Sequence, residues 1–376
     1  MNQQPGEVVL VIGTRPEAIK QLPIYFALKR VGVPVKICAT AQHSELAQQI
    51  FSLFEVAPDF ILQPMQAGYD LAQLTSALLN QLTSFFVAQK PRLVVVQGDT
   101  TSAYSAALAA FYLQIPVAHI EAGLRTNNLA APFPEEFNRQ AISLIAKYHF
   151  TPTEVATANL LKFGINPRTI FQVGNTGMDA QRLILGKIGT ADCMIPASFT
   201  DLVKKFKAKK RKLVLFTVHR RESLADVIKN LLGVVKNYAE LHPEVAFVYP
   251  VHPNPQIQTA VQRSQLACVS NIYLCPPLLY HELTYLLSQA DCVVTDSGGL
   301  QEEAVGLGCP VIVLRQELDR PESVTAGLAW SAGYDPDLIC SILDIVLQLN
   351  KFQPSDLYGD GRAAERVAQT LKQELI

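Results

Sequence analysis

The sequence lacks several features that would assign it to a specialised class of protein. Its charge is balanced, with 32 Lys and Arg residues against 33 Asp and Glu residues, so there is no basic excess for nucleic acid or an anionic membrane. No stretch approaches the roughly 20 consecutive apolar residues of a membrane span. The first residues, MNQQPG, do not have the layout of a secretory signal peptide. We therefore expect a cytoplasmic protein that binds neither nucleic acid nor membrane.

Motifs for metal, nicotinamide and acyl-transfer chemistry are also missing. The seven cysteines, at positions 38, 193, 268, 275, 292, 309 and 340, form no C-x-x-C pair. We expect them to be buried free thiols, as in a reducing compartment. No G-x-G-x-x-G follows an expected strand, and no G-x-S-x-G is present. No spacing of His, Cys and carboxylates is typical of a metal site, so the sequence predicts neither a metal nor a cofactor.

What the chain does contain is a repeated unit of a strand, a short loop and a helix. Residues 8–12 form a continuous apolar run, which is typical of a strand buried on both faces. Similar runs lie at 33–38, 93–96 and 117–118, and a second series lies at 213–216, 245–249, 272–275, 292–295 and 310–314. Alternating strands and helices predict parallel sheets covered by helices on both faces.

The repeated pattern weakens between about residues 180 and 210. The basic run 204–211 falls there, and we interpret it as a solvated helix face. A chain of 376 residues also favours two domains on length alone. We therefore predict an α/β protein with two doubly wound Rossmann-like domains and a ligand cleft between them. The first spans 1–185, completed by a C-terminal helix over 358–376, and the second spans 186–357.

Acidic residues follow the expected strands of the first domain. Asp99 comes after the strand at 93–96, and Glu121 and Glu135 lie in the segment after the strand at 117–118, HIEAGLRTNNLAAPFPEEFNR. Open α/β sheets bind ligands at the carboxyl ends of their strands, so we expect these carboxylates to converge. Taken alone, Glu135 and Arg139 equally fit a surface helix pair.

Basic residues at the first strand end suit an anionic ligand. Arg15, in the loop GTRPE, fits a bidentate contact with a diphosphate. Lys20, one helical turn further along, either assists that contact or is only exposed. Glu136 and the arginines of the acidic segment stay open to a structural role.

The second domain offers a phosphate site and two histidines. Ser297, Gly298 and Gly299 join a strand to a helix, where free N–H groups bind phosphate, although Ser297 could act only as a helix cap. Glu303 could accept hydrogen bonds from a ribose diol. We favour a functional role for His219, which follows a strand and precedes two arginines. His252 fits loop architecture and a binding role equally well.

Taken together, the motifs resemble those of the non-hydrolysing UDP-N-acetylglucosamine 2-epimerases. The matching segments occur in the same order over nearly the whole chain: GTRPEAIK (13–20), QGDTTS (97–102), HIEAGLRT (119–126), PFPEEFNR (132–139), VGNTGMDA (173–180), HRRES (219–223), VHPNP (251–255), DSGGLQEEA (296–304) and DRPESVTAG (319–327). The resemblance implies a GT-B-like pair of domains, usually in a homodimer, with UDP held mainly by the second. It also implies interconversion of UDP-GlcNAc and UDP-ManNAc, as a precursor supply for bacterial surface polysaccharide.

The implied reaction is elimination of UDP to give 2-acetamidoglucal, followed by re-addition with the proton on the other face. Carboxylates must surround the reacting carbons, and here they are Asp99, Glu121 and Glu135. Positive groups must meet the departing diphosphate: Arg15, His219, the helix start at 297–299 and, by family position, Arg320. Which carboxylate takes the proton stays open.

Several residues depart from the family pattern. Leu318 and Asp319 precede Arg320 where the family commonly has Thr and Glu, and the segment 276–280 lacks a polar residue beside the base. Segments 42–46 and 68–71 also differ, and in bacterial members they resemble a second-substrate (allosteric) site. These last departures bear on allosteric activation more than on catalysis.

Three other functions fit the same residues. They are epimerisation of a modified UDP-GlcNAc, such as a 3-acetamido uronate, a GT-B glycosyltransferase activity, and nucleotide-sugar binding without turnover. The clustered acids of the first domain favour the epimerase over the glycosyltransferase.

Overall fold

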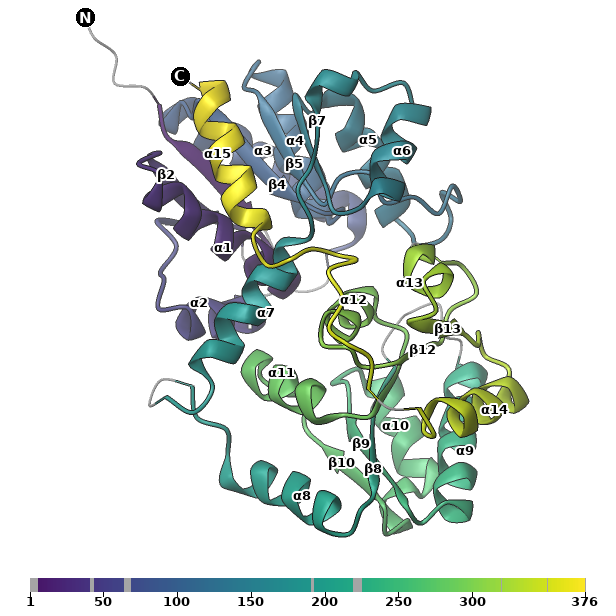
Figure 1. The fold of residues 1–376 in the computed structure, drawn as a ribbon. Coiled ribbons are helices and arrows are strands. Elements are labelled where there is room, and N and C mark those ends of the chain that lie inside the picture. Colours follow the sequence, from purple (N-terminus) through teal and green to yellow (C-terminus); the bar gives the residue numbers. More distant parts are fainter. Residues whose placement is uncertain are drawn as a thin grey trace, which may run out of the picture. The chain divides into compact units, whose positions relative to one another are not determined.

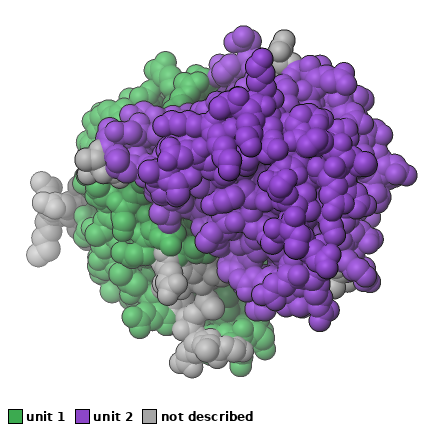
Figure 2. All heavy atoms as spheres, turned by 90° about the horizontal axis from the view of Figure 1, so that it is seen from below, with its two compact units in different colours: residues 1–182, 358–376 green, residues 183–357 purple. Residues whose placement is uncertain are grey.

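The computed structural model describes residues 6–40, 44–63, 69–190, 193–218, 225–318, 320–349 and 351–375. The chain divides into two compact units, residues 1–182 with 358–376 and residues 183–357. Figure 1 shows their elements, and Figure 2 colours the two units separately. Each unit is built on one parallel sheet.

Unit 1 contains a seven-stranded sheet in the order β3-β2-β1-β4-β5-β6-β7. Its strands are β1 (Val8–Ile12), β2 (Val35–Ala39), β3 (Phe60–Ile61), β4 (Leu93–Gln97), β5 (Val117–Ile120), β6 (Tyr148–Thr151) and β7 (Ile170–Gln172). The strand order runs outward in both directions from β1 and β4. Loops that follow these two strands therefore meet at the topological switch point, where α/β proteins bind ligands.

Helices cover both faces of this sheet (Figure 1). They are α1 (Arg15–Arg30), α2 (Ser44–Leu53), α3 (Leu71–Gln89), α4 (Thr101–Tyr112), α5 (Glu135–Ile145), α6 (Glu154–Lys162), α7 (Thr176–Lys187) and α15 (Ala363–Leu375), with a 3₁₀ turn at Pro167–Thr169. Along β1, Val8 and Leu10 pack into one core with α1 and α15, whereas Val9 and Val11 pack into another with α3 and α4. The alternation follows from the period of two in a strand, and it explains the continuous apolar run.

The last helix of the chain belongs to unit 1. α15 packs against α1, and its Val367 and Leu371 join the same core as Leu10. The first N–H groups of α15, from Ala363 and Ala364, donate to the Asp179 carboxylate of α7 at 3.2 and 2.9 Å. A carboxylate supplied by a distant helix thus caps the α15 N-terminus.

Unit 2 contains a six-stranded sheet in the order β10-β9-β8-β11-β12-β13. Its strands are β8 (Lys212–Thr217), β9 (Val245–Pro250), β10 (Ile272–Cys275), β11 (Cys292–Thr295), β12 (Val311–Val313) and β13 (Ala329–Ser331). Its helices are α8 (Ala197–Ala208), α9 (Ala225–Leu241), α10 (Pro255–Ser264), α11 (Tyr280–Gln289), α12 (Gly298–Gly306), α13 (Pro321–Thr325) and α14 (Pro336–Val346), with a 3₁₀ turn at Leu266–Cys268. The largest core cluster joins α9, α10 and α14 to β8 and β9.

The predicted fold class, two doubly wound Rossmann-like domains, is confirmed by the two parallel sheets. The basic run at 204–211 is also a solvated face, because α8 buries Phe199, Val203 and Phe206 and exposes its lysines. No helix within the described ranges is long and apolar enough to cross a membrane.

Two sequence expectations were wrong in part. Five of the seven cysteines are buried, but Cys268 is exposed and Cys340 is only half-buried; all seven are free thiols. The strand expected to end at Ala118 continues to Ile120, so His119 lies inside the sheet. The Gly98 carbonyl accepts a hydrogen bond from Nε2 of the buried histidine ring, which offsets part of the penalty of burying it.

Candidate active site

Three loops at the carboxyl edge of the unit 1 sheet carry predicted site residues. Arg15 follows β1, Asp99 follows β4 and Glu121 follows β5. Thr14 caps α1 and Thr100 caps α4, so the first two loops pass directly into a helix. Short loops between a buried strand and a capped helix fix the position of Arg15 and Asp99 closely.

Glu121 has a strained backbone and two side-chain partners. Its φ of +63° is in the left-handed region, which is uncommon for a residue other than glycine. The Lys20 ammonium forms an ion pair with Oε1, and the Gln97 amide donates to Oε2. The structure therefore places Lys20, predicted to bind substrate, against a predicted catalytic carboxylate. Gln97 was not singled out in the sequence, although its position at a strand end could have indicated it.

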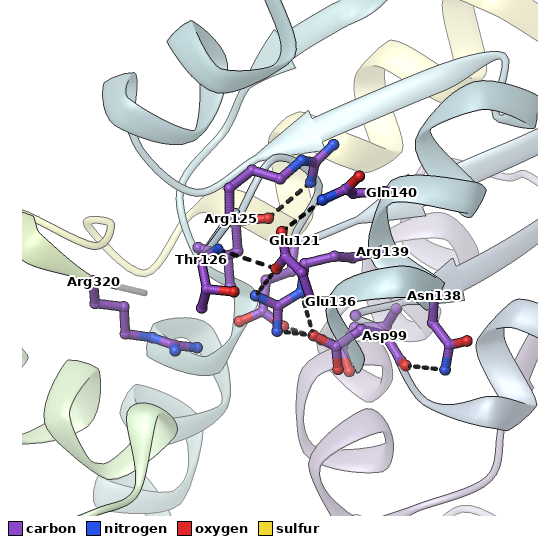
Figure 3. Close-up of polar contacts among 12 residues, drawn as sticks. Asp99, Glu121, Arg125, Thr126, Glu136, Asn138, Arg139, Gln140 and Arg320 are labelled. Carbon is purple, nitrogen blue, oxygen red and sulfur yellow. Dashed lines mark hydrogen bonds and ion pairs between the residues drawn. The ribbon is translucent and has the colours of Figure 1, made fainter. Parts of the chain in front are cut away.

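Asp99 is held by α5 (Figure 3). Arg139 Nε donates to Asp99 Oδ2 at 2.8 Å, and Nη2 contacts the same oxygen. Asn138 donates to the Asp99 backbone carbonyl at 2.9 Å. Arg139 is only 5% exposed, so its guanidinium does not lie on a solvated helix face.

The first two residues of α5 have different surroundings. Glu136 is fully buried, and its carboxylate accepts hydrogen bonds from the Thr126 and Asn127 backbone N–H groups, each at 3.1 Å. It thereby anchors the loop that follows Glu121, a contact that favours the structural role left open for it. Glu135 is half-buried, and its catalytic role stays a prediction.

His119 supports the turn that presents Asp99. It is fully buried in β5, and its Nε2 lies 2.8 Å from the Gly98 carbonyl oxygen. Burial lowers the pKa of His119 to about 3, so the imidazole is neutral and donates from Nε2. Gly98 has a φ of +69°, which glycine adopts without steric cost. The histidine thus holds the carbonyl of a turn that requires glycine.

Glu17 joins the loop after β1 to the loop after β4. It is 1% exposed, and its Oε2 accepts hydrogen bonds from Gly13 N at 2.9 Å and Thr14 Oγ1 at 2.8 Å. Its Oε1 accepts from Thr100 Oγ1 at 2.7 Å. Burial raises the pKa of Glu17 to about 7, although these hydrogen bonds act in the opposite direction. The T-x-x-E spacing of Thr14 and Glu17, typical of a capping box, could have identified this residue.

In unit 2 the predicted phosphate site is a capped helix start beside an arginine. Ser297 is the N-cap of α12, and its hydroxyl accepts a hydrogen bond from the helix backbone. A Cβ at Gly298 would lie 2.2 Å from Arg320 Nη1, whereas a Cβ at Gly299 would meet nothing within 4 Å. Arg320 is buried and forms an ion pair with Glu302. A helix N-terminus with a guanidinium against it suits a diphosphate.

Two further predicted residues of unit 2 are Glu303, inside α12, and His252, shortly after β9. The Tyr280 hydroxyl donates to Glu303 Oε1 at 3.3 Å. His252 Nδ1 accepts a hydrogen bond from Asn254 N at 3.2 Å, and this contact fixes the ring against the backbone of its own loop. Both Glu303 and His252 are half-buried, and their substrate contacts stay predictions.

Some predicted residues lie outside the described ranges. They are His219, Asp319 and parts of the two segments compared with a second-substrate site, namely residues 42–43 and 68. Within the described ranges, no group of three or more His, Cys, Asp and Glu side chains is placed to hold a metal ion.

The buried Glu17 carboxyl should make the stability of unit 1 depend on pH. Its pKa is about 7 in the folded chain against an ordinary 4.5, so the folded state retains a proton that the unfolded state releases. The free energy of unfolding should therefore fall as pH rises from about 4.5 to 7, by about 3 kcal/mol from this group. A Glu17→Gln chain should lack this decrease, and urea unfolding followed by circular dichroism measures it.

An internal control is available for that experiment. The single tryptophan, Trp330, lies in β13 of unit 2, so its fluorescence follows a unit that does not contain Glu17. The pH dependence of the tryptophan transition should be the same in both chains. An identical pH dependence of the unit 1 transition in both chains would contradict the assignment.

Comparison with known proteins identifies the family. Residues 27–372 match the family model described as UDP-N-acetylglucosamine 2-epimerase. The UDP-N-acetylglucosamine 2-epimerase of Salmonella typhimurium is 39% identical over 372 residues, which cover 97% of this chain and 98% of that protein.

Two solved structures extend the likeness to three dimensions. The UDP-GlcNAc 2-epimerase of Neisseria meningitidis bound to UDP-GlcNAc has a TM-score of 0.89 and 37% identity, with 98% of this chain and 100% of that chain covered. The Methanocaldococcus jannaschii enzyme in complex with UDP-GlcNAc and UDP has a TM-score of 0.86 and 30% identity, with 98% and 99% covered. The chain belongs to the UDP-N-acetylglucosamine 2-epimerase family.

Proposed function

We propose that this chain interconverts UDP-GlcNAc and UDP-ManNAc by non-hydrolysing epimerisation at C2. The observation that carries the proposal is a pair of carboxylates, Asp99 and Glu121, at the ends of the neighbouring strands β4 and β5. Each is held by a buried cation, Arg139 for Asp99 and Lys20 for Glu121. Family membership over nearly the whole chain supports the same reaction.

The chemistry explains why carboxylates are needed. The C2 hydrogen of the sugar is not next to a carbonyl, so direct removal by a base would be very slow. Departure of UDP from C1 develops positive charge on the ring, which acidifies that hydrogen and is stabilised by nearby carboxylates. Removal of the proton gives 2-acetamidoglucal, and delivery of a proton to the opposite face with return of UDP gives the epimer. We assign these transfers to Asp99, Glu121 and Glu135 together.

In this proposal the nucleotide is bound mainly through unit 2. The helix start at Ser297, Gly298 and Gly299, with Arg320 beside it, receives the diphosphate, and the Glu303 carboxylate accepts hydrogen bonds from the ribose. Arg15 and His219 stabilise the departing UDP, and His252 contacts the substrate. Lys20 contributes to the charge balance at the diphosphate in addition to its ion pair with Glu121.

We also place the enzyme in the cytoplasm, as the supplier of a precursor for bacterial surface polysaccharide. The free cysteines support the first point. A family that acts on a nucleotide sugar supports the second.

Proton NMR of UDP-GlcNAc with the protein in D2O tests the proposed reaction. We expect deuterium to replace the C2 proton and UDP-ManNAc to appear without any added acceptor. Release of free ManNAc would show a hydrolysing enzyme, and product formation only with an acceptor would show a glycosyltransferase. UDP binding with an unchanged sugar spectrum would show a binding protein or an enzyme for a modified sugar.

Replacement of Asp99 by Asn should separate chemistry from binding. We expect the rate of C2 exchange to fall by about 100-fold or more, which is the usual contribution of a general acid or base. UDP affinity, measured by calorimetry, should change little, because the proposed diphosphate site is in unit 2. An Asp201→Asn chain is the control, since Asp201 is an exposed residue of α8. Full exchange activity in the Asp99→Asn chain would contradict the proposed role.

We propose further that the enzyme is a homodimer through α4 and α5. These helices pack together, with the Tyr104 and Phe137 rings meeting edge-on at a centroid distance of 5.7 Å. Phe111 and Leu144 each come two helical turns after that contact and are 52% and 69% exposed. Exposed apolar side chains grouped on neighbouring helices are typical of an interface with another protein.

A Leu144→Glu chain should therefore be monomeric. Light scattering after size-exclusion chromatography should give about twice the chain mass of 41.3 kDa for the original protein and a single chain mass for the variant. Leu241→Glu is the matched control, because Leu241 is 77% exposed but ends α9 in unit 2. A dimer that survives the Leu144 change would exclude this face.

A further inference from the structure

Glu136 lies behind Asp99, on the other side of Arg139, and its carboxylate faces four hydrogen-bond donors. Its Oε2 accepts from Thr126 N at 3.1 Å and faces Arg139 Nη1 at 3.3 Å. Its Oε1 accepts from Asn127 N at 3.1 Å and from Gln140 Nε2 at 2.8 Å. Four donors on two oxygens fit an ionised carboxylate, because a carboxylic acid proton would face a donor at either oxygen. Glu136 is also fully buried, so it has no access to a substrate.

Arg139 transmits the position of Glu136 to Asp99. The guanidinium is planar and rigid, so a contact at Nη1 fixes the direction of Nε and Nη2 as well. Those two nitrogens both contact Asp99 Oδ2. Within the described residues, Oδ1 has no such contact, and the Asp99 side chain is 23% exposed. The orientation of Arg139 therefore decides which oxygen of Asp99 is available for chemistry (Figure 3).

Glu136 also affects the ion pair of Arg139 and Asp99 through its negative charge. Arg125 and Arg139 are both buried, and the two carboxylates Asp99 and Glu136 match their two positive charges. Burial lowers the pKa of Arg125 to about 10, and the charge of Glu136 acts against that decrease. Loss of the Glu136 charge would remove a negative charge from beside two buried guanidinium groups, and such a change is costly in a protein interior.

We propose that Glu136 is a positioning residue for the reaction: it sets the plane of the Arg139 guanidinium and so presents Asp99 Oδ1 to the sugar. The inference rests on the proposed function, specifically on the catalytic role of Asp99. Glu136 touches neither substrate nor reacting atoms, and it acts only through Arg139.

A double-mutant cycle between positions 136 and 99 tests this. The four proteins are the original chain, Glu136→Gln, Asp99→Asn and the chain with both changes, and each is assayed for kcat, KM and C2 exchange. We expect Glu136→Gln to lower kcat by about 10- to 100-fold, as loss of a supporting hydrogen bond does at other sites, with KM changed by less than about threefold. In the Asp99→Asn background the same change should lower kcat by less than about threefold.

A purely structural role gives a different pattern. It would lower kcat by the same factor in both backgrounds, and that result would overturn the inference, as would an unchanged kcat for Glu136→Gln alone. The number of UDP sites per chain, measured by calorimetry, corrects each rate for unfolded protein. Glu154→Gln is the matched control, because Glu154 also lies in the first turn of a helix but is exposed.

Failure of the proposed function can be told apart from failure of this inference. An original chain without epimerase activity, or an active Asp99→Asn chain, would remove the role that Glu136 is proposed to support. An active original chain, an inactive Asp99→Asn chain and an additive cycle would remove only the role of Glu136. If Glu136→Gln does not fold, Glu136→Asp replaces it in the cycle, because the shorter side chain keeps the charge and withdraws it from Arg139.

Discussion

The buried bridge from Asp99 through Arg139 to Glu136 is the interaction on which the carboxyl edge of unit 1 depends. It joins the loop after β4 to α5 and, through the backbone contacts of Glu136, to the loop after β5. Removal of one member would take an ion-pair partner away from a buried charge, at a cost of several kcal/mol. The same buried contacts therefore position both the loops and the catalytic candidates that the loops carry.

The sheet brings those loops together, but it does not orient them. β4 and β5 are hydrogen-bonded neighbours, so Asp99 and Glu121 must emerge side by side. Orientation comes from polar residues near the carboxyl end of each strand. His119 holds the Gly98 carbonyl, and Gln97 holds the Glu121 carboxylate. Buried polar groups weaken a strand core unless they are paired, and here their pairing is what shapes the site.

Sequence patterns predicted the features that depend on local order. The strands that end before Asp99 and Ser297 could be read directly, because apolar runs and caps are local. Lys20 was expected to meet substrate, yet its ammonium meets Glu121, a partner 101 positions away. Glu135 and Glu136 are chemically identical neighbours, and only the rotation of about 100° per helical residue, together with the packing around α5, decides which one is buried.

The two proposed catalytic pairs differ in the chemistry of their cations. Lys20 carries a compact ammonium that can release a proton, and it contacts Glu121 directly. Arg139 cannot be deprotonated under these conditions, and its contact with Asp99 is fixed by a rigid plane. A proton passed from Lys20 to Glu121 would leave both groups neutral and the net charge of the pair unchanged, whereas in the Asp99 pair only the carboxylate can accept or deliver a proton. Asp99 and Glu121 occupy equivalent positions at two strand ends, but their different cationic partners give them different proton-transfer chemistry.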